Sequence, residues 1–284
     1  MIRVGLVDHH LNNFHANKFV QLLHGPLAEL GARVVCAWES DPVGEDWCAR
    51  TGIARVGSAE AAAESCDAVM VLAPDNVETH RVLCSRVFPA GRPVFVDKYL
   101  APTTEDARAI LAEADRYNVN LYSSSSLRFA MEHRELWKPG MRPSEAFARG
   151  MGDWMGYGVH TVALLQASLG SGAARVLDSG SSHASVVTVE YRDGRRGWIE
   201  VREAANQWEV FPWTFGFRDG ERYVTGTVRD YEGFYSNLMR EVVSFFGTQA
   251  APPGRDAMVE TVAILEAAGE SRMRGGEWVA LDQL

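Results

Sequence analysis

The sequence predicts an α/β protein with two domains. Residues 1–122 are expected to form a Rossmann-like, doubly wound parallel sheet, and residues 123–284 an α+β domain with a mostly antiparallel open sheet. Two patterns carry this prediction. Short apolar runs alternate with helical periodicity in the first half, which is typical of a parallel sheet. Over residues 175–228 the pattern changes to period-2 alternation, which is typical of strands with one solvated face.

The elements of the first domain follow from apolar runs and helical spacing. Gly31 is expected to end the first long helix, and the run Val94–Val96 is apolar enough to be buried on both faces of a sheet. Strands are predicted at 2–7, 32–38, 68–72 and 94–96 and from 120, and helices at 13–30, 46–51, 58–65, 78–87 and 103–117.

The second domain is predicted to be a meander with flanking helices. Asp193-Gly194 and Asp219-Gly220 provide hairpin turns. Residues 138–152 are rich in glycine and proline and are expected to be a loop. Strands are predicted at 175–181, 184–191, 196–203, 208–217, 222–228 and 277–281, and helices at 130–137, 160–169, 231–246 and 255–273.

Composition excludes several classes of partner. The net charge is −9 and no lysine or arginine stripe occurs, so neither nucleic acid nor an acidic membrane is expected to bind. No apolar run approaches the roughly 20 residues that span a bilayer. Met1 leads directly into a strand without a signal peptide, and the four cysteines form no C-x-x-C pair. We therefore expect a cytoplasmic protein with reduced thiols and a small-molecule substrate.

A lysine follows the apolar run at the predicted carboxyl edge of the first sheet. Asp97 and Lys98 stand where open parallel sheets bind their ligands. A lysine that is desolvated there has a lowered pKa and can exchange protons near neutral pH. The alternative is a solvated lysine that merely ends a strand.

Four segments in this order resemble the glucose–fructose oxidoreductase/inositol dehydrogenase (Gfo/Idh/MocA) family. They are the first strand, Ala73-Pro74-Asp75-Asn76 with His80 downstream, Gly91–Ala101 and Gly158-Val159-His160, and the stretch 237–281 also resembles the family's ending. Asp97-Lys98-Tyr99 stands where the family usually has Glu-Lys-Pro. The resemblance implies an NAD-dependent oxidoreductase acting on a sugar, cyclitol or related polyol.

The loop after the first strand departs from the dinucleotide pattern. The G-x-G-x-x-G motif lets backbone N–H groups approach a diphosphate, but only Gly5 is present here and it lies within the strand. Side chains of residues 8–13 would crowd a diphosphate, and Asp8 adds negative charge. Asn12 or Asn13 is expected to substitute in part by adopting positive φ.

Glu39 favours NAD over NADP. It ends the second strand, where an acid accepts hydrogen bonds from ribose hydroxyls and repels a 2′-phosphate. Asp75-Asn76 either line the cofactor groove or form a turn that caps the next helix. The predicted cofactor-binding residues are Asp8, His9, Asn12, Asn13, Glu39, Pro74, Asp75, Asn76, Asp97 and Lys98.

The same loop contains a possible metal-binding cluster of Asp8, His9, His10 and His15. Imidazole and carboxylate are suitable ligands for a divalent metal. However, adjacent histidines point in different directions, and no H-x-x-x-H spacing is present. Local hydrogen bonding is the favoured interpretation, so no metal site is predicted.

The resemblance places His160 in the active site, at the entrance of a helix. The family's usual acid lies four positions earlier, where this chain has Gly156, and Tyr157 is either a proton donor or a packing residue. Lys98, His160 and Tyr157 are the predicted catalytic residues. Ser124, Ser125, Arg128 and His160 are expected to orient the substrate, with Arg128 able to pair with an anionic group.

Two classes of function remain open. Glu39, Asp97-Lys98 and His160 favour the NAD-dependent oxidoreductase. The lost glycines and the lost acid favour a member without the dinucleotide, either a metal- or water-dependent lyase or isomerase or a ligand-binding protein. A homodimer or homotetramer is expected in both cases, because the second sheet is rich in aromatic residues, namely Trp198, Trp208, Phe211, Trp213 and Phe215. The alternative is that these aromatics fill the core between sheet and helices.

Overall fold

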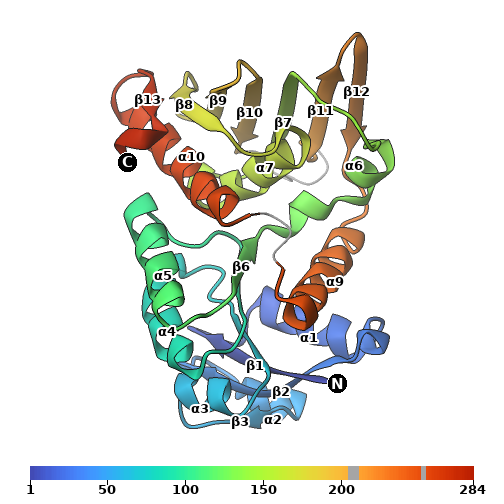
Figure 1. Cartoon of the computed structure of the whole chain (residues 1–284), viewed down its shortest axis with the longest axis vertical. Coiled ribbons are helices and arrows are strands. Elements are labelled where there is room, and N and C mark those ends of the chain that lie inside the picture. Colours follow the sequence, from blue (N-terminus) through green and yellow to red (C-terminus); the bar gives the residue numbers. More distant parts are fainter. Residues whose placement is uncertain (204–210, 251–253) are drawn as a thin grey trace. The chain divides into compact units, whose positions relative to one another are not determined.

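The computed structural model describes residues 1–203, 211–250 and 254–284, which form two compact units (Figure 1). Unit 1 contains Met1–Ser124 and Leu238–Met258, and unit 2 contains Ser125–Asn237 and Val259–Leu284. The chain first passes from unit 1 to unit 2 after Ser124, two residues beyond the predicted boundary at residue 122. Among the described helices, none is both long and apolar enough to cross a bilayer.

Unit 1 is built on a parallel sheet of six strands in the order β3-β2-β1-β4-β5-β6. The predicted doubly wound fold is therefore confirmed for this unit, and its direction of winding reverses between β1 and β4. The strands are β1 (Ile2–Asp8), β2 (Ala32–Glu39), β3 (Ala54–Arg55), β4 (Ala68–Val71), β5 (Val94–Asp97) and β6 (Leu121–Ser124). The short, exposed β3 was not predicted, because two residues carry no periodicity.

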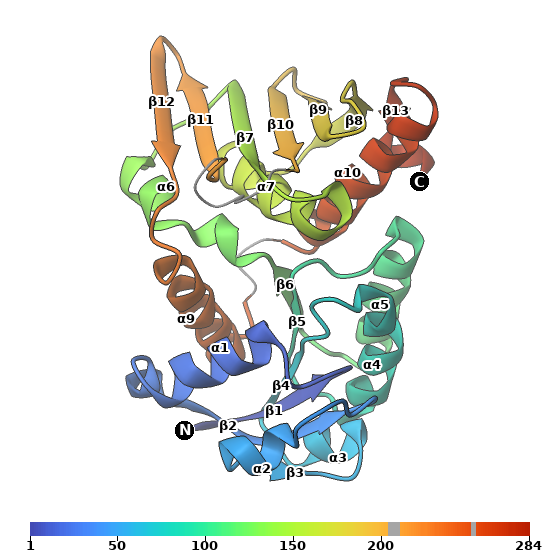
Figure 2. The same ribbon diagram turned by 180° about the vertical axis from the view of Figure 1, so that it is seen from behind.

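Side-chain caps begin most of the α-helices of unit 1. Asn13, Asp46, Ser58 and Thr103 each accept a hydrogen bond from a backbone N–H of the first turn. The helix predicted over 13–30 already ends at His24, because the Gly25-Pro26 pair interrupts it. The helices are α1 (Phe14–His24), η1 (Ala28–Leu30), α2 (Trp47–Thr51), α3 (Ala59–Glu64), η2 (Val77–Thr79), α4 (His80–Val87), η3 (Phe88–Ala90) and α5 (Thr104–Arg116). Helices α4 and α5 lie together on one side of the sheet (Figure 2).

The C-terminal part of the chain returns to unit 1. The ring of Phe245 on α9 (Gly233–Thr248) lies 5.5 Å from that of Tyr122 on β6. Arg255, the first residue of α10 (Arg255–Met273), pairs with Asp115. These contacts explain why residues 238–258 belong to unit 1, although the sequence assigned them to the second domain.

Unit 2 contains a mixed sheet of seven strands in the order β12-β11-β7-β10-β9-β8-β13. All pairs but one are antiparallel, as predicted; β7 and β10 run parallel. The strands are β7 (Glu145–Met151), β8 (Ala173–Asp178), β9 (Ala184–Tyr191), β10 (Arg196–Arg202), β11 (Thr214–Asp219), β12 (Arg222–Thr227) and β13 (Val279–Ala280). The predicted strand 208–217 begins at Thr214, and its residues 208–210 lie outside the described part.

The prediction of a loop over residues 138–152 is wrong, because Glu145–Met151 form strand β7, which lies between β10 and β11 in the sheet. Its inward residues Ala146, Ala148 and Gly150 are small and buried. A Cβ on Gly150 would lie 2.1 Å from the Trp213 ring, so the close approach of this ring requires glycine. The apolar signal of the strand is weak for this reason, which hid it among glycines and prolines.

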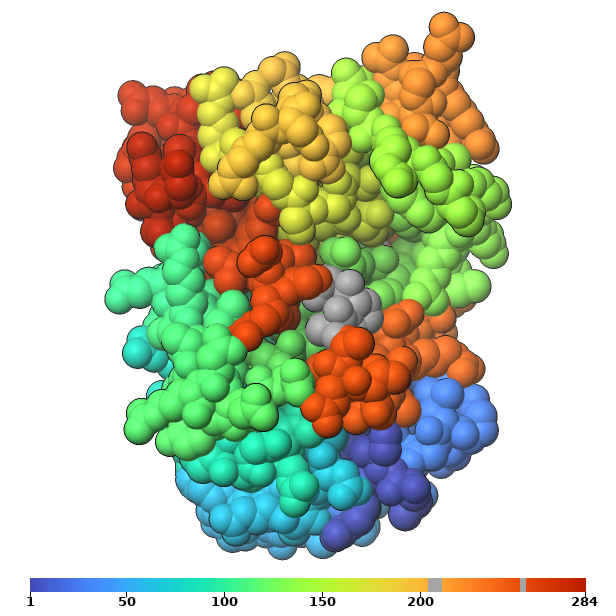
Figure 3. Space-filling view, in the orientation of Figure 1, coloured from blue at the N-terminus to red at the C-terminus, as the bar shows by residue number. Residues whose placement is uncertain are grey.

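Helices cover one face of the second sheet, and its aromatic residues divide between the two faces. Trp213 and Phe215 are buried in the core, whereas Trp198 is 39% exposed. Trp208 lies outside the described residues. The β11–β12 hairpin, coloured orange, stands out from the surface of unit 2 (Figure 3). Besides α7 (Trp154–Leu169), α10 and the start of α9, this unit contains η4 (Ser126–Phe129), α6 (Met131–Leu136) and η5 (Leu281–Gln283).

Candidate functional site

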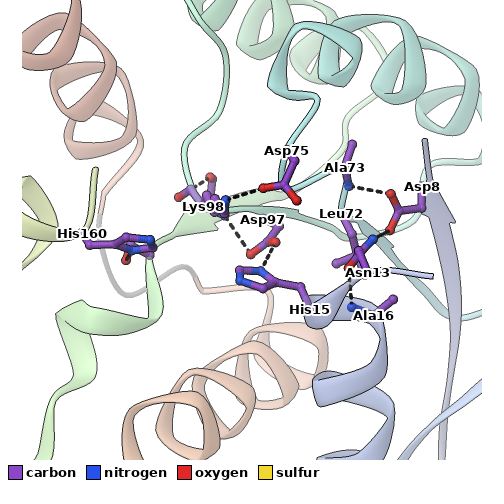
Figure 4. Close-up of polar contacts among 12 residues, drawn as sticks. Asp8, Asn13, His15, Ala16, Leu72, Ala73, Asp75, Asp97, Lys98 and His160 are labelled. Atoms are coloured by element: carbon purple, nitrogen blue, oxygen red, sulfur yellow. Dashed lines mark hydrogen bonds and ion pairs between the residues drawn. The ribbon is translucent and has the colours of Figure 1, made fainter. Parts of the chain in front are cut away.

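Two residues at the carboxyl edge of the first sheet have left-handed backbone conformations. Ala73 follows β4 with φ 39°, and Lys98 follows β5 with φ 57°. Neither is a glycine, so each conformation is strained and has to be held by its surroundings. Such strain concentrates at functional sites, which makes this edge the first candidate in unit 1 (Figure 4).

Lys98 is held by two aspartates. Its backbone N–H donates to Asp97 Oδ1 at 2.8 Å, and its ammonium Nζ donates to Asp75 Oδ1 at 3.3 Å (Figure 4). The Lys98 side chain is only 12% exposed, while that of Asp75 is 81% exposed. The structure therefore brings together three of the residues predicted to bind the cofactor, and it keeps the Lys98 ammonium largely away from solvent.

Asp97 is completely buried against a histidine that the sequence did not connect with it. The Nδ1 atom of His15, in the first turn of α1, hydrogen-bonds the Asp97 carboxylate. Burial acts to raise the pKa of Asp97, but the charges of His15 and Lys98 and the His15 hydrogen bond outweigh it and lower the pKa. His15 therefore belongs to the Lys98 edge, although the sequence groups it with Asp8, His9 and His10.

Asp8 lies at the end of β1, where the glycine-rich loop of a dinucleotide fold normally begins, and its carboxylate binds backbone N–H groups there. Its Oδ1 accepts from the backbone N–H groups of His9 at 2.7 Å, His10 at 3.2 Å and Ala73 at 3.0 Å. Its Oδ2 accepts from the Asn13 amide at 2.8 Å. Burial nevertheless raises the pKa of Asp8 to about 7, because desolvation outweighs these hydrogen bonds.

The asparagines of this loop do not replace the missing glycines. Asn13 has φ −117° and caps α1 by accepting from the Ala16 N–H, and Asn12 is not among the described residues with positive φ. The prediction that one of them adopts positive φ is therefore wrong. Asn12 instead accepts a hydrogen bond from Arg50.

Glu39 ends β2 as predicted, but it is buried and engaged. Its Oε2 accepts from the Leu11 N–H at 2.7 Å, and its Oε1 accepts from Arg55 Nη2 at 2.9 Å. Arg55 also pairs with Asp46. Glu39 thus ties the loop after β1 to the end of β2, and a ribose would have to share or displace these contacts.

The residues of unit 1 fit a dinucleotide in part. The parallel sheet, the N-terminus of α1 and the acid at the end of β2 are all present. The N–H groups of His9, His10 and Leu11 are bonded to carboxylates of the protein itself. A diphosphate would therefore compete with Asp8 and Glu39 for the donors that glycine-rich loops leave open.

Unit 2 contributes a buried hydroxyl–imidazole pair. Ser125 Oγ lies 2.7 Å from His160 Nδ1, and His160 is only 8% exposed. The rings of Tyr157 and Trp213 lie 5.9 and 5.6 Å from the His160 ring. The two predicted residues Ser125 and His160 are therefore brought together, with Tyr157 beside them.

The helix that carries His160 begins earlier than predicted. Helix α7 starts at Trp154, and Asp153 caps it by accepting from the Gly156 N–H at 2.7 Å. His160 therefore lies in the second turn and not at the helix entrance, which corrects the prediction. The start of the helix was predicted too late because Gly156 and Gly158 lie in its first turns, and glycine is a poor helix former.

The other two predicted substrate residues, Ser124 and Arg128, belong to different units. Ser124 ends β6 in unit 1, in register with Asp97 on β5. Arg128 lies on η4 in unit 2 and lines a cavity of about 550 Å³ together with Trp137, Arg142 and Arg195. Neither Ser125 nor His160 is among the residues that line this cavity.

The match to a known family covers the first unit. Residues 5–125 match the Gfo/Idh/MocA family model, which is described as "Oxidoreductase family, NAD-binding Rossmann fold". The resemblance to this family is confirmed. The match supports the oxidoreductase class, and it confirms NAD as the expected cofactor at the level of the family. No curated protein sequence matches the chain significantly.

Solved structures of this type match both units. A probable dehydrogenase from Thermotoga maritima has a TM-score of 0.83 at 16% identity, with 99% of each chain covered. GenD2 from gentamicin A biosynthesis, solved with NAD, has a TM-score of 0.80 at 20% identity, with 99% of this chain and 97% of GenD2 covered. The scyllo-inositol dehydrogenase from Lactobacillus casei, solved with NAD(H) and scyllo-inositol, has a TM-score of 0.78 at 12% identity, with 99% of each chain covered. At these identities the similarity establishes the Gfo/Idh/MocA fold.

Sequence reasoning missed four residues that complete these sites, namely His15 as the partner of Asp97, Arg55 as the partner of Glu39, Ala73 with its strained backbone, and Asp41 beside the two histidines of the loop. Each depends on segments that are distant in sequence. The position of His15 at the start of a helix was the only available signal, and it does not identify a partner.

Proposed function

We propose that the protein is an NAD-dependent oxidoreductase that acts on a sugar, cyclitol or related polyol. The observation that carries the proposal is the strained, shielded Lys98 at the carboxyl edge of the first sheet. The family match supports the cofactor, and the inositol dehydrogenases among the structural neighbours support the substrate class. When bound, NAD would accept or supply the hydride.

In unit 1, the neutral Lys98 amine accepts the proton of the reacting hydroxyl when the alcohol is oxidised, and the Lys98 ammonium returns it when the carbonyl is reduced. Its ammonium carries three donors, and Asp75 positions it. Asp97 hydrogen-bonds both His15 and the Lys98 backbone N–H, and it thereby holds the segment from which the lysine side chain extends. Pro74, Asp75 and Asn76 follow β4 at the same edge and would hold the nicotinamide end of the cofactor.

In unit 2, the Ser125–His160 pair is the second proton-transfer element. The Ser125 hydrogen bond orients the imidazole and selects which ring nitrogen carries the proton. We assign acid–base exchange with the substrate to His160 Nε2, and a supporting donor role to Tyr157. The proposal therefore requires turnover to depend on His160 as well as on Lys98.

Glu39 sets the choice of cofactor in this proposal. NAD is expected to bind more tightly than NADP, because a 2′-phosphate would meet the Glu39 carboxylate. Glu39→Ala removes this charge. It also removes one of the two carboxylates that pair with Arg55, the other being that of Asp46. The ratio of NADP to NAD affinity should then rise by about tenfold, as for the loss of one charged hydrogen bond. Calorimetry with both dinucleotides measures the ratio.

Asp46→Asn is the matched control, because it removes the other acid on Arg55 and leaves Glu39 in place. It should keep the preference for NAD. Tighter binding of NADP by the unmodified protein would contradict the role of Glu39.

A second candidate function is favoured by the carboxylates that occupy the loop donors. Asp8 and Glu39 satisfy three of the N–H groups that a diphosphate would use. A protein of this fold without a dinucleotide would be a lyase or isomerase, or a ligand-binding protein. Absence of binding of both NAD and NADP at millimolar concentration would favour this candidate over the oxidoreductase.

A homodimer or homotetramer is also proposed, with the outer face of the second sheet as the contact. Trp198 and Val186 are 39% and 36% exposed on neighbouring strands β10 and β9. Light scattering at micromolar concentration is expected to give a multiple of the 31.3 kDa chain mass. Trp198→Glu should shift the mass towards one chain, while Val82→Glu, which changes an exposed residue on α4 of unit 1, should not. A single-chain mass for the unmodified protein would refute the proposal.

A further inference from the structure

Two loops of unit 1 bring His9, His10 and Asp41 together. His9 and His10 follow β1, and Asp41 follows β2. The centroids of the two imidazole rings lie 4.1 Å apart. Backbone hydrogen bonds hold the loops against each other, because the Ser40 N–H donates to the Asp8 carbonyl and the Asp41 N–H to the His9 carbonyl, each at 3.0 Å. The three side chains are therefore presented by a fixed scaffold.

The same ring nitrogen of each histidine is already engaged. His10 Nδ1 lies 2.5 Å from the Asp41 backbone carbonyl, and His9 Nδ1 lies 2.7 Å from Ser40 Oγ. A carbonyl oxygen only accepts, so His10 Nδ1 must carry the hydrogen. In the neutral ring, Nε2 then presents a lone pair.

The Nε2 atoms of both rings face one carboxylate oxygen. His9 Nε2 lies 4.0 Å and His10 Nε2 3.9 Å from Asp41 Oδ2, and the three ligand atoms lie within 4.8 Å of one another. The Nε2 lone pair of a neutral His10 ring that faces a carboxylate repels it unless a cation lies between them. The separations exceed those of a direct hydrogen bond and leave room for an ion.

We propose that His9, His10 and Asp41 form a binding site for a first-row divalent transition metal such as Zn²⁺. The ligand atoms need only a small contraction to reach metal–ligand distances of about 2.0–2.2 Å. The Nδ1 hydrogen bonds are the outer contacts that orient metal-binding histidines in proteins. Imidazole nitrogen selects Zn²⁺ over Mg²⁺, which prefers oxygen ligands.

The site lies on the loops that hold the dinucleotide under the proposed function, but it does not depend on that function. All three ligands belong to unit 1, and their side chains are accessible, with exposed fractions of 23%, 35% and 60%. The competing interpretation is a protonated histidine that pairs with Asp41 without a metal.

The test is metal binding by the full chain after chelator treatment, without a nucleotide. Calorimetry with Zn²⁺ is expected to show one ion per chain at micromolar affinity or better, and Mg²⁺ should give no comparable binding. Co²⁺ should produce visible absorption bands of a histidine-ligated ion. His10→Ala and Asp41→Asn should each weaken Zn²⁺ binding by at least about tenfold. His183→Ala changes an exposed histidine outside the cluster and should leave the affinity unchanged.

Three results would overturn the proposal. They are the absence of stoichiometric Zn²⁺ binding, unchanged affinity in both variants, or an equal loss in the His183→Ala control. Since the Asp41 side chain is 60% exposed, Asp41→Asn is expected to fold even if a histidine variant does not. Circular dichroism of each variant checks this point before the titration.

Discussion

Replacing His160 or Lys98 with alanine is expected to lower turnover of a polyol substrate by about 10²–10⁴-fold. In the proposed reaction each residue moves a proton in the transition state, His160 with Ser125 on its ring and Lys98 with Asp75 on its ammonium. Steady-state rates per folded molecule measure the effect.

Burial of His160 also affects the stability expected of its variant. His160 is only 8% exposed and hydrogen-bonded to Ser125. His160→Ala should therefore also destabilise the protein by about 1–3 kcal/mol. Turnover and thermal midpoint have to be measured on the same samples.

His133 provides a matched control for this experiment. It is a buried histidine of the same unit, 4% exposed, and its Nε2 lies 3.0 Å from Ser168 Oγ. His133→Ala removes a similar histidine–serine pair and should cost stability while leaving turnover per folded molecule unchanged. Equal losses of turnover in His133→Ala and His160→Ala would show that His160 acts through the fold alone.

The second large effect concerns Asp8 and the pH dependence of stability. Burial raises the pKa of Asp8 from 3.8 to about 7 in the folded protein. The unfolded chain thus loses this proton at lower pH than the folded chain does. The contribution of protonated Asp8 to the free energy of unfolding is complete below pH 4 and is lost as pH rises to 7. A pKa difference of about three units corresponds to a loss of about 4 kcal/mol in the free energy of unfolding.

Denaturant unfolding between pH 4 and 8 measures this loss in the unmodified protein and in Asp8→Asn. The variant has no titrating group at position 8, so the difference between the two curves should fall by about 4 kcal/mol as pH rises. Asp46→Asn serves as a comparison without a slope in this range, since the hydrogen bond from Arg55 lowers the pKa of Asp46. The stability that Asp46 adds is complete above its unfolded pKa of 3.8 and is lost only as pH falls below that value. Parallel curves for the unmodified protein and Asp8→Asn would contradict the assignment.

Local patterns predicted most of the secondary structure because burial on one face or on both faces leaves a periodic record. The run Val94–Val96 became β5, and the glycines of the two predicted hairpins, Gly194 and Gly220, have φ 89° and 61°. The strand β7 escaped because packing against Trp213 requires small residues there, and small residues carry little hydrophobic signal.

The candidate sites were predicted less completely than the fold. Lys98, Asp75 and Asp97 were expected at one sheet edge, and parallel strands bring their carboxyl ends to that edge regardless of the loops between them. Asn12 and Asn13 were misjudged because their conformations depend on what their side chains bind. Asn13 binds Asp8 and the first turn of α1, which keeps its φ negative.

The sequence by itself therefore determined most of the strands and helices, the Gfo/Idh/MocA resemblance, and the presence of an acid at the end of β5 with a lysine directly after it. Only the tertiary structure decided which groups those residues meet. His15 reaches Asp97 across 82 positions, Glu39 bonds the Leu11 N–H across 28, and Asp41 joins His9 and His10 from another loop. The physical reason is that periodicity records which face of an element is buried, whereas hydrogen bonds between distant loops leave no periodic trace in the sequence.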